Sequence, residues 1–375
     1  MNAAWLSLLL LAGEPVPAAE EAPPPPAEAP ATRAAAVRST PSPPASPFFT
    51  LGPLTLSPWL DVFGSFEGDW PTGAASYNHF AVPRSLAGLE LSAEGFRGRF
   101  LIEGVYSTDN GALIGTAGDS IVLRLREAWG GYRWRFLEAR LGVIPDPQFG
   151  PLEHAWGFRE LSPDGLEAFR LVAPADFGAS LRAWLPAELG WVALSVTNGE
   201  GYGQRELNTG KNLTLSATVR PLSFARQLEV VGSGVIGSTG LAQTQANRLG
   251  GGVLWDGDWL GAGVTAYGFW GLDDDGGRRG LLLEGFARAQ LFERLLLAVR
   301  GERLWRDFSA SSDDSITTFI AGVGVRVGFG LELFAEYERD ALSPLARASL
   351  PGADLNTVRV VARLNPFVSH LEDWR

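Results

Sequence analysis

Apolar and polar residues alternate with a period of two along most of the chain after residue 50. Within residues 211–220, for example, Leu213, Leu215, Ala217 and Val219 share one face, and polar side chains occupy the other. This period is typical of a β-strand, whose side chains point alternately to the two faces of a sheet. Because no helical pattern separates the many strands, the sheet must either split into sandwiches or close on itself.

The lengths of the strands and of their connections favour a closed membrane barrel. Strands of soluble proteins usually have about 5 to 6 residues, whereas crossing a bilayer at a tilt takes about 9 to 11. Short turns alternate with longer polar connections, as periplasmic turns alternate with extracellular loops in bacterial barrels. We therefore predict an all-β fold, a transmembrane antiparallel up-and-down β-barrel of about 16 strands. The expected strands span 54–66, 84–93, 95–107, 119–129, 136–144, 176–185, 189–197, 211–220, 227–237, 247–256, 259–270, 280–290, 294–305, 315–327, 330–340 and 355–366.

Charged residues of the expected strands lie on the opposite parity from the apolar ones. Phe96 and Phe100 would face lipid, whereas Arg97 and Arg99 would face the lumen. A charge facing lipid at the bilayer midplane would cost about 2 to 4 kcal/mol, and a barrel of this size encloses water. Tryptophans near strand ends are expected at the membrane interfaces: Trp59, Trp129, Trp134, Trp191, Trp255, Trp259, Trp270 and Trp305.

Composition excludes several classes of protein. The 375 residues include no cysteine, which rules out disulfides, thiolate metal sites and a cysteine nucleophile. The formal net charge of -11 argues against a nucleic-acid partner, because binding phosphates requires clustered positive charge. No stretch beyond the N-terminus approaches the roughly 18 consecutive apolar residues of a membrane-spanning helix.

The first 47 residues are expected to lie outside the barrel. Residues 1–18 contain an apolar run from Trp5 to Leu11 and end in Val16-Pro17-Ala18, which predicts a secretory signal peptide, although no basic residue precedes the run. Residues 19–47 are rich in Pro, Ala and Glu and predict a disordered periplasmic linker. Residues 48–375 are then the barrel domain.

Four segments of the central third carry a resemblance to a known family. They are residues 125–132 (LREAWGGY), 137–145 (LEARLGVIP), 175–181 (ADFGASL) and 196–202 (VTNGEGY). In these segments the chain resembles the outer-membrane phosphate-selective porin family, porin O/P-like barrels. The resemblance implies a sixteen-stranded barrel, usually trimeric, that passes small anions or other solutes. Phosphate selectivity in that family is associated with lysines, and because this chain has only Lys211, we do not carry phosphate specificity over.

The longest connection, from Pro145 to Pro174, is the third extracellular loop by this count. General porins fold that loop inward, so we expect it to form a constriction; an outward surface flap is the alternative. Its aromatic residues would let a polar loop pack within a wet lumen, and long ordered loops are usually functional. The candidate constriction residues are Asp146, Glu153, His154, Arg159, Glu160, Asp164, Glu167 and Arg170.

An arginine wall is expected to line the pore opposite this loop. Facing an acidic loop, it would produce a transverse field that favours anions. Alternatively, these arginines pair with lumenal carboxylates, among them Glu332 and Glu336, and only stiffen the wall. The candidate pore-lining residues are Arg97, Arg99, Glu103, Arg124, Arg126, Glu138, Arg140, Arg182, Arg359 and Arg363.

No catalytic residue, metal ligand or cofactor is expected. The histidines His79, His154 and His370 lie in no recognisable nucleophile motif, and the acidic groups at 273–275 and 313–314 lack the spacing of a calcium loop. We predict a porin of the bacterial outer membrane for passive diffusion of small hydrophilic solutes, with anion preference. Its expected partners are outer-membrane lipid, lipopolysaccharide, permeant anions and further copies in a homotrimer. The rival is a non-conducting barrel that acts as a structural anchor or receptor.

Overall fold

The computed structural model describes nine stretches of the chain. The signal peptide and the linker expected at residues 1–47 lie outside them, as does His370, so those predictions stay open. The described residues are 49–72, 75–107, 120–203, 208–240, 243–272, 275–292, 294–311, 313–349 and 354–366.

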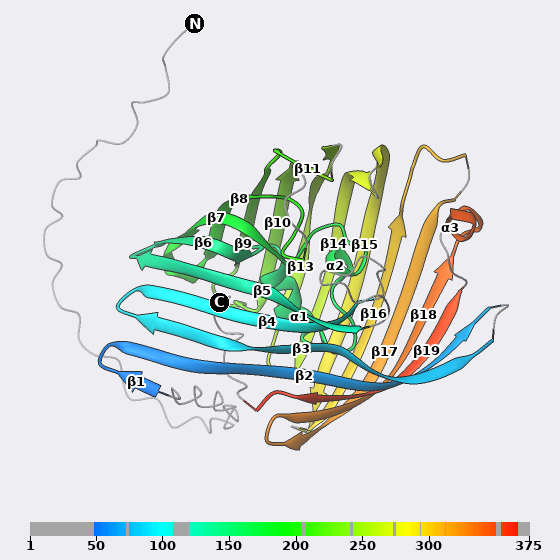
Figure 1. Cartoon of the computed structure of the whole chain (residues 1–375), viewed down its shortest axis with the longest axis horizontal. Helices are drawn as coiled ribbons and strands as arrows, with labels where there is room; N and C mark the ends of the chain where they lie inside the picture. The colour runs from blue at the N-terminus through cyan, green and yellow to red at the C-terminus, as the bar shows by residue number, and fades with distance from the viewer. Residues whose placement is uncertain are drawn as a thin grey trace, which may run out of the picture. The chain divides into compact units, whose positions relative to one another are not determined.

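Sixteen of the described strands form one closed antiparallel sheet, because the last strand, β19, pairs with β2 (Figure 1). The short strand β1 (Phe49–Leu51) only extends the edge of β2, and β11 (Ser238–Thr239) and β12 (Thr244–Gln245) form a separate hairpin. The barrel strands are β2 (Leu54–Pro71), β3 (Tyr77–Ala93), β4 (Phe96–Ser107), β5 (Ser120–Trp134), β6 (Leu137–Pro145), β7 (Ala175–Trp184), β8 (Gly190–Thr197), β9 (Asn212–Val219), β10 (Leu228–Ile236), β13 (Asn247–Asp256), β14 (Leu260–Leu272), β15 (Asp275–Leu291), β16 (Leu295–Trp305), β17 (Ser315–Gly328), β18 (Leu331–Leu342) and β19 (Leu355–Leu364).

The predicted barrel is confirmed strand by strand, since each expected span corresponds to one barrel strand in the same order. The strict alternation of short and long connections is wrong at two places. Strand β2 extends to Pro71 and β3 already begins at Tyr77. Likewise, β14 extends to Leu272 and β15 already begins at Asp275. Pairing continues into these polar segments, because backbone hydrogen bonds do not depend on side-chain polarity.

Exposure alternates along the strands, with apolar side chains outside and polar ones inside. On β16, Leu297 and Val299 are 38% and 46% exposed, whereas Arg300 and Glu302, which have the opposite parity, are buried. An apolar outer face on a closed barrel is the arrangement that a membrane requires, because no sheet edge is left unpaired. The barrel therefore belongs in the bacterial outer membrane.

Three tryptophans do not lie at the expected interfaces. Trp59, Trp129 and Trp191 share the parity of lumenal residues, and Trp129 and Trp191 are 8% and 1% exposed. A register shift between β4 and β5 at Leu101/Ile102 reverses the parity of the segment that holds Trp129. Trp134, Trp255 and Trp259 are exposed outside, as expected.

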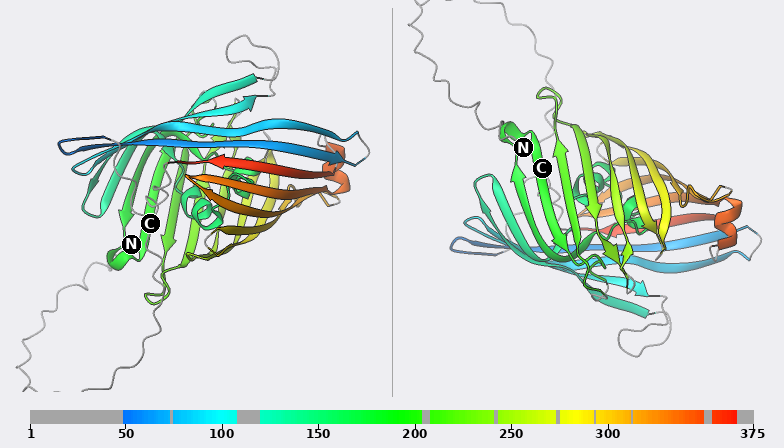
Figure 2. Two further views of the ribbon diagram at one scale, coloured as in Figure 1. Left: turned by 90° about the horizontal axis from the view of Figure 1, so that it is seen from below. Right: turned by 90° about the horizontal axis from the view of Figure 1, so that it is seen from above.

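Short helices lie in the connections. The connection between β6 and β7 contains α1 (Phe149–Trp156) and α2 (Gly165–Ala168), which Figure 2 shows within the ring of strands. Gly157, with a φ of 73°, ends α1, and the Asp164 carboxylate caps α2. The remaining helices are η1 (Pro186–Glu188) and α3 (Pro344–Ser349). None of the described helices is long and apolar enough to cross a membrane.

Candidate functional site

Residues 146–174, here called the lumenal loop, pack against one side of the barrel interior. Helix α1 contacts β13, β14 and β15, and α2 contacts β15. The Trp156 ring lies edge-on to Phe286 of β15 with centroids 5.7 Å apart, and the Phe158 ring lies edge-on to Phe334 of β18 at 5.5 Å. Leu152, Leu161 and Leu166 of the loop belong to the same buried apolar cluster. The loop therefore packs on the barrel wall through an apolar core, as the aromatic content of the segment suggested.

Glycines on the wall make room for the loop. A Cβ at Gly261 of β14 would lie 2.7 Å from the Ala155 carbonyl oxygen, and one at Gly322 of β17 would lie 2.7 Å from Leu161 Cδ1. Real Cβ atoms do not approach other atoms this closely, so larger residues at these positions would displace the loop. The absence of a side chain here thus serves close approach.

Four lumenal arginines, here called the anchor arginines, hold the loop from four strands. Arg248 of β13 donates to the Leu171 carbonyl at 2.9 Å, and Arg288 of β15 donates to the Ala155 carbonyl at 2.8 Å. Arg300 of β16 donates to Ser162 Oγ at 2.7 Å. Arg363 of β19 donates to Glu160 Oε2 at 3.0 Å and to both oxygens of Asp61. Sequence parity placed Arg363 in the lumen but opposite the loop; the structure places it in contact with the loop.

Two carboxyl groups of the loop are buried against this wall. The Gly165 N–H donates to Glu284 Oε2 at 2.7 Å, which places Asp164 close to a second acid. Burial, together with Glu284 and Glu167, raises the pKa of Asp164 to about 8. Burial also raises the pKa of Glu160 to about 7, although the Arg363 guanidinium opposes the rise.

The open side of the loop carries a mixed-charge cluster. Carboxylate oxygens of Glu153, Asp164 and Glu167 lie within 4.8 Å of one another, and the Arg159 guanidinium forms ion pairs with Glu153 and Glu167. That arginine already neutralises the carboxylates that a cation would need. Arg159 and Glu167 are close enough to Glu103 of β4 to interact with it electrostatically. The loop thus faces the opposite wall through charged side chains.

The histidine of the loop is not placed for nucleophilic catalysis. His154 Nε2 lies 2.8 Å from Asp256 Oδ2 of β13. The Ser162 hydroxyl instead accepts from Arg300 and donates to the Pro163 carbonyl. Sequence proximity between His154, Ser162 and Asp164 therefore does not become a Ser-His-Asp arrangement.

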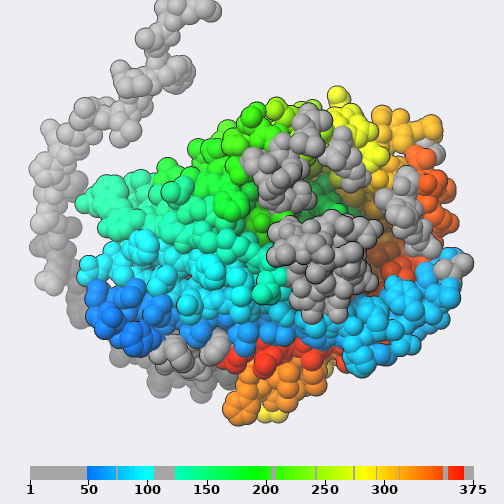
Figure 3. Space-filling model, viewed as in Figure 1, coloured from blue at the N-terminus to red at the C-terminus, as the bar shows by residue number. Residues whose placement is uncertain are grey.

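The lumenal side of strands β3 to β7 is rich in arginine. Figure 3 locates these strands by colour on the face of the molecule that it shows. Several of these arginines have carboxylate partners. Arg126 lies 3.4 Å from Glu103, Arg140 lies 2.5 Å from Glu138, and Arg99 lies 3.6 Å from Glu127 and also pairs with Glu90. Arg124 is half-buried on the same side and forms no ion pair with another described residue.

Lumenal aromatic rings stack on the same arginines. The Arg140 guanidinium lies 4.3 Å from the centre of the Trp129 ring, and that of Arg182 lies 4.4 Å from Trp191. Arg99 lies over Trp59 at 5.2 Å. These cation-π contacts explain why the three tryptophans face the lumen, since an arginine plane covers the apolar ring that would otherwise face water.

The 196–202 segment forms a second inward feature that the sequence had marked only as a resemblance. Its N–H groups bond back to β7: Gly199 N donates to the Asp176 carboxylate at 2.5 Å, and Tyr202 N donates to the Ala175 carbonyl at 2.9 Å. The Tyr202 hydroxyl then donates to Glu103, and Arg126 lies over its ring at 5.5 Å. Tyr202 is a candidate pore residue that alternation could not find, because its position depends on the folding of a loop, whereas Asp176 shares the lumenal parity of Arg182 on β7 and was not singled out.

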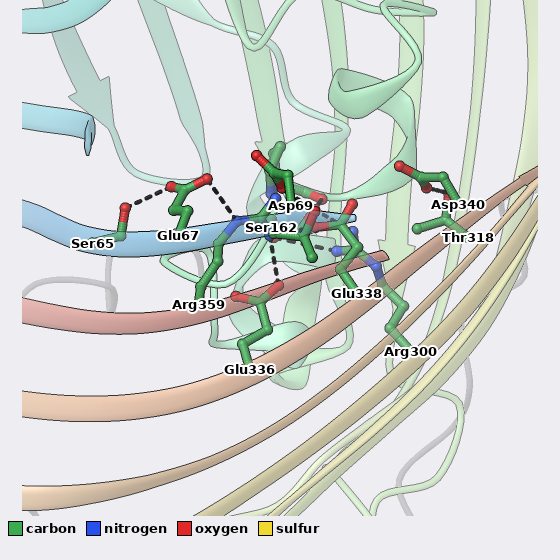
Figure 4. A network of polar contacts seen from close by, with 12 residues as sticks. Ser65, Glu67, Asp69, Ser162, Arg300, Thr318, Glu336, Glu338, Asp340 and Arg359 are labelled. Carbon is green, nitrogen blue, oxygen red and sulfur yellow. Dashed lines mark hydrogen bonds and ion pairs between the residues drawn. The ribbon is translucent and has the colours of Figure 1, made fainter. Parts of the chain in front are cut away.

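Arg359 lies in an acidic cluster, away from the wall that was expected to include it. Its guanidinium pairs with Glu336 at 2.8 Å, with Glu67 at 3.2 Å and with Glu338 (Figure 4). Arg359 is therefore outnumbered by carboxylates of β2 and β18, and it does not belong to the arginine wall.

The two sides of the lumen differ in charge. From β3 to β7, the described lumenal side chains include the arginines Arg84, Arg97, Arg99, Arg124, Arg126, Arg133, Arg140 and Arg182 and the acids Glu90, Glu103, Glu127, Glu138 and Asp176. On β2 and β15 to β19 they include the acids Asp61, Glu67, Asp69, Glu284, Glu302, Glu332, Glu336, Glu338 and Asp340 and the arginines Arg288, Arg300, Arg326, Arg359 and Arg363. Positive charge is in excess on the first side and negative charge on the second, against which the lumenal loop packs.

The remaining candidates lie at the edges of this site. Arg97 lines a hollow of about 390 Å³ at the β3–β4 turn together with Arg133 and Arg135. Arg170 is exposed at the end of the loop, and Asp146 accepts from the backbone N–H of Gln148 at 2.9 Å. Each role assigned to these residues from sequence stays a prediction.

Known structures share this fold. An anion-selective porin from Comamonas acidovorans matches with a TM-score of 0.60 and 12% identity, over 83% of this chain and 99% of its own. The OmpF of Salmonella typhi, in complex with daunomycin, matches with a TM-score of 0.60 and 13% identity over 83% and 98%. The DcaP channel of Acinetobacter baumannii matches with a TM-score of 0.57 and 11% identity over 85% and 99%. No family model and no curated protein matches, so the phosphate-selective family stays a prediction. By its fold, the chain is a sixteen-stranded barrel of the kind found in outer-membrane porins.

Proposed function

We propose that the protein is a porin, a water-filled channel for passive diffusion of small hydrophilic solutes across the outer membrane, with a preference for anions. One observation carries the proposal: the lumenal loop is anchored on β13 to β19, which leaves its charged side facing the arginine-rich strands. Permeating solutes would then pass between Arg159 and Glu167 of the loop and the opposite wall at Glu103, Arg124 and Arg126.

Anion preference follows from where the charged side chains lie in the lumen rather than from the net charge of the chain. The excess of carboxylates belongs to β2 and β15 to β19, the side against which the lumenal loop packs. The excess of arginines belongs to β3 to β7, on the other side of the loop. A solute in the gap therefore meets a positive wall, and the opposite sign across the gap produces a transverse field.

Pairing of the wall arginines favours the alternative that they only stiffen the barrel. Ion pairs with Glu90, Glu103, Glu127 and Glu138 cancel much of the positive charge at short range. Arg124, which interacts with Glu103 electrostatically but forms no ion pair within 4 Å with a described residue, and the excess of arginines over acids on these strands remain as the source of selectivity. The proposal predicts a moderate preference for anions.

Reversal potentials in planar bilayers across a salt gradient test the proposal. The wild-type channel should prefer chloride over potassium, and Arg124→Gln combined with Arg126→Gln should shift the reversal potential toward cations. Arg226→Gln is the matched control, because Arg226 is exposed and pairs with Glu188 outside the lumen. Cation preference of the wild type would contradict the arginine wall.

The rival function is a barrel without conduction that acts as an anchor or receptor. The apolar core formed by Trp156, Phe158 and wall residues fills part of the lumen and supports this reading. A correctly folded barrel, recognised by heat-modifiable gel migration, that gives no channels would establish it. A trimer, which one neighbour from Vibrio cholerae is described as forming, stays a prediction for this chain.

A further inference from the structure

The outward face of the barrel carries almost no charge, and its few charges are concentrated. Among the described strand residues, the outward parity holds three basic side chains: Arg279 of β15, Arg303 of β16 and Arg339 of β18. All the other described strand arginines have lumenal parity. These three, here called the outer arginine cluster, lie within the four consecutive strands β15 to β18, so their positions are not scattered around the barrel.

The three arginines also lie at the same end of the barrel. Arg303 pairs with Thr317 of β17, which pairs with Ala341 of β18, and Arg339 is two residues from Ala341. With about 4.8 Å between strands and about 3.3 Å per residue along them, the backbones of Arg303 and Arg339 are about 12 Å apart. Arg279 lies two residues beyond Leu281, the partner of Trp305. This is the end at which the 306–314 and 343–354 connections lie, opposite the tight turns.

The guanidinium groups are available on the outer surface. Arg279 and Arg339 are exposed, and neither forms an ion pair with another described residue. Arg303 pairs with the exposed Asp313 at 2.9 Å and lies 4.8 Å from the Trp305 ring centre, so its position is fixed at the rim. The outward surface beside and below them is apolar: Leu283, the cross-strand partner of Arg303, is 41% exposed, Phe319, the partner of Arg339, is 46% exposed, and Val323, further along β17, is 45% exposed.

We propose that the outer arginine cluster binds the phosphate groups of a glycolipid of the outer leaflet, the phosphorylated lipid A part of lipopolysaccharide. A guanidinium facing hydrocarbon is unfavourable, but near the interface it meets lipid headgroups, and its planar donors match phosphate oxygens. The apolar side chains beside and below the arginines would accommodate the acyl chains. This proposal rests on the outer-membrane location of the barrel and not on conduction through its lumen.

Titration of the purified full-length protein with bis-phosphorylated lipid A, read by native mass spectrometry, tests the proposal. The triple variant Arg279→Gln, Arg303→Gln, Arg339→Gln should bind lipid A at least about tenfold more weakly than the wild type, because each arginine near a lipid phosphate contributes separately to binding. Arg326→Gln is the matched control: that arginine is exposed but points to the lumenal side, where it pairs with Glu332. Wild-type binding should also fall when the lipid A is dephosphorylated.

Three results would overturn the proposal. They are equal binding of lipid A by the wild type and the triple variant, equal binding of phosphorylated and dephosphorylated lipid A, and an altered oligomeric state of the variant with unchanged lipid binding. The last result would make the cluster a contact between copies. Heat-modifiable migration establishes that the variant folds, and its unit conductance should equal that of the wild type, which keeps this test separate from that of the channel.

Discussion

Asp164 makes the seating of the lumenal loop depend on pH. Its side chain is 2% exposed, and Oδ1 caps α2 by accepting from the N–H groups of Leu166 and Glu167. Oδ2 has no hydrogen-bond partner among the described residues. A buried carboxyl with a free oxygen, beside Glu284 and Glu167, favours the protonated form, and its pKa is raised to about 8.

The sign of the effect follows from linkage. A pKa raised in the seated loop stabilises seating fully below the ordinary value of 3.8, and the stabilisation is lost as the pH rises through about 8. Between pH 7 and pH 9 the loss for Asp164 is on the order of 1 kcal/mol, and that for Glu160, with its pKa of about 7, is smaller. The seated loop should therefore open on the order of ten times more often at pH 9 than at pH 7.

Asp164→Asn isolates this contribution, because asparagine keeps the capping oxygen and cannot ionise. Hydrogen exchange of peptides within 149–171, corrected for intrinsic rates, should show only about a twofold increase in opening over the same pH range. Asp307→Asn, in the exposed 306–314 connection, should behave like the wild type. The reasoning is refuted if Asp164→Asn keeps the wild-type pH dependence, or if wild-type protection rises with pH.

Three further perturbations probe the loop and its surroundings. Arg363→Gln leaves Asp61 and the buried Glu160 without their shared partner, which should weaken seating of the lumenal loop by about 3 to 5 kcal/mol. Hydrogen exchange within 149–171 measures this loss, and unchanged protection would contradict the anchoring role of Arg363. Gly322→Val should displace Leu161 and raise unit conductance, whereas Gly301→Ala, with nothing within 4 Å of its Cβ, should not; equal conductance of the two variants would argue against a seated constriction. Tyr202→Phe removes a hydrogen bond to the Glu103 carboxylate, at a cost of about 1.5 to 3 kcal/mol. Residues 196–202 should therefore lose hydrogen-exchange protection. Full protection would show that the backbone contacts to β7 are sufficient to hold the segment.

The barrel was predictable because its signal is local. Alternation with period two depends only on neighbouring residues, so it revealed each strand and the lumenal parity of Arg99, Arg126 and Arg140 without knowledge of pairing. The alternation pattern failed where strand pairing changes the parity of a strand or the length of a connection. The register shift at Leu101/Ile102 reverses parity on β5 and turns Trp129 inward. Strand pairing as far as Asp69/Tyr77 and Leu272/Asp275 shortens two expected connections.

The candidate site was only partly predictable. Sequence placed Pro145 to Pro174 as a long loop with charged and aromatic residues, and it named Glu160 and Arg363 without connecting them. Arg248, Arg288 and Arg300 were not singled out, because their role depends on which wall the loop packs against. No spacing in the sequence encodes that choice.

The sequence by itself therefore determined the strands, their membrane-facing and lumenal sides and the absence of cysteine chemistry, since these follow from local alternation and composition. Only the tertiary structure decided which arginines anchor the loop and which face it. Closing the barrel brings β19 beside β2 and the loop across to β13 and β15, so residues more than a hundred positions apart, such as Gly165 and Glu284, become hydrogen-bond partners. Such contacts depend on the curvature and closure of the whole sheet, which no local pattern records.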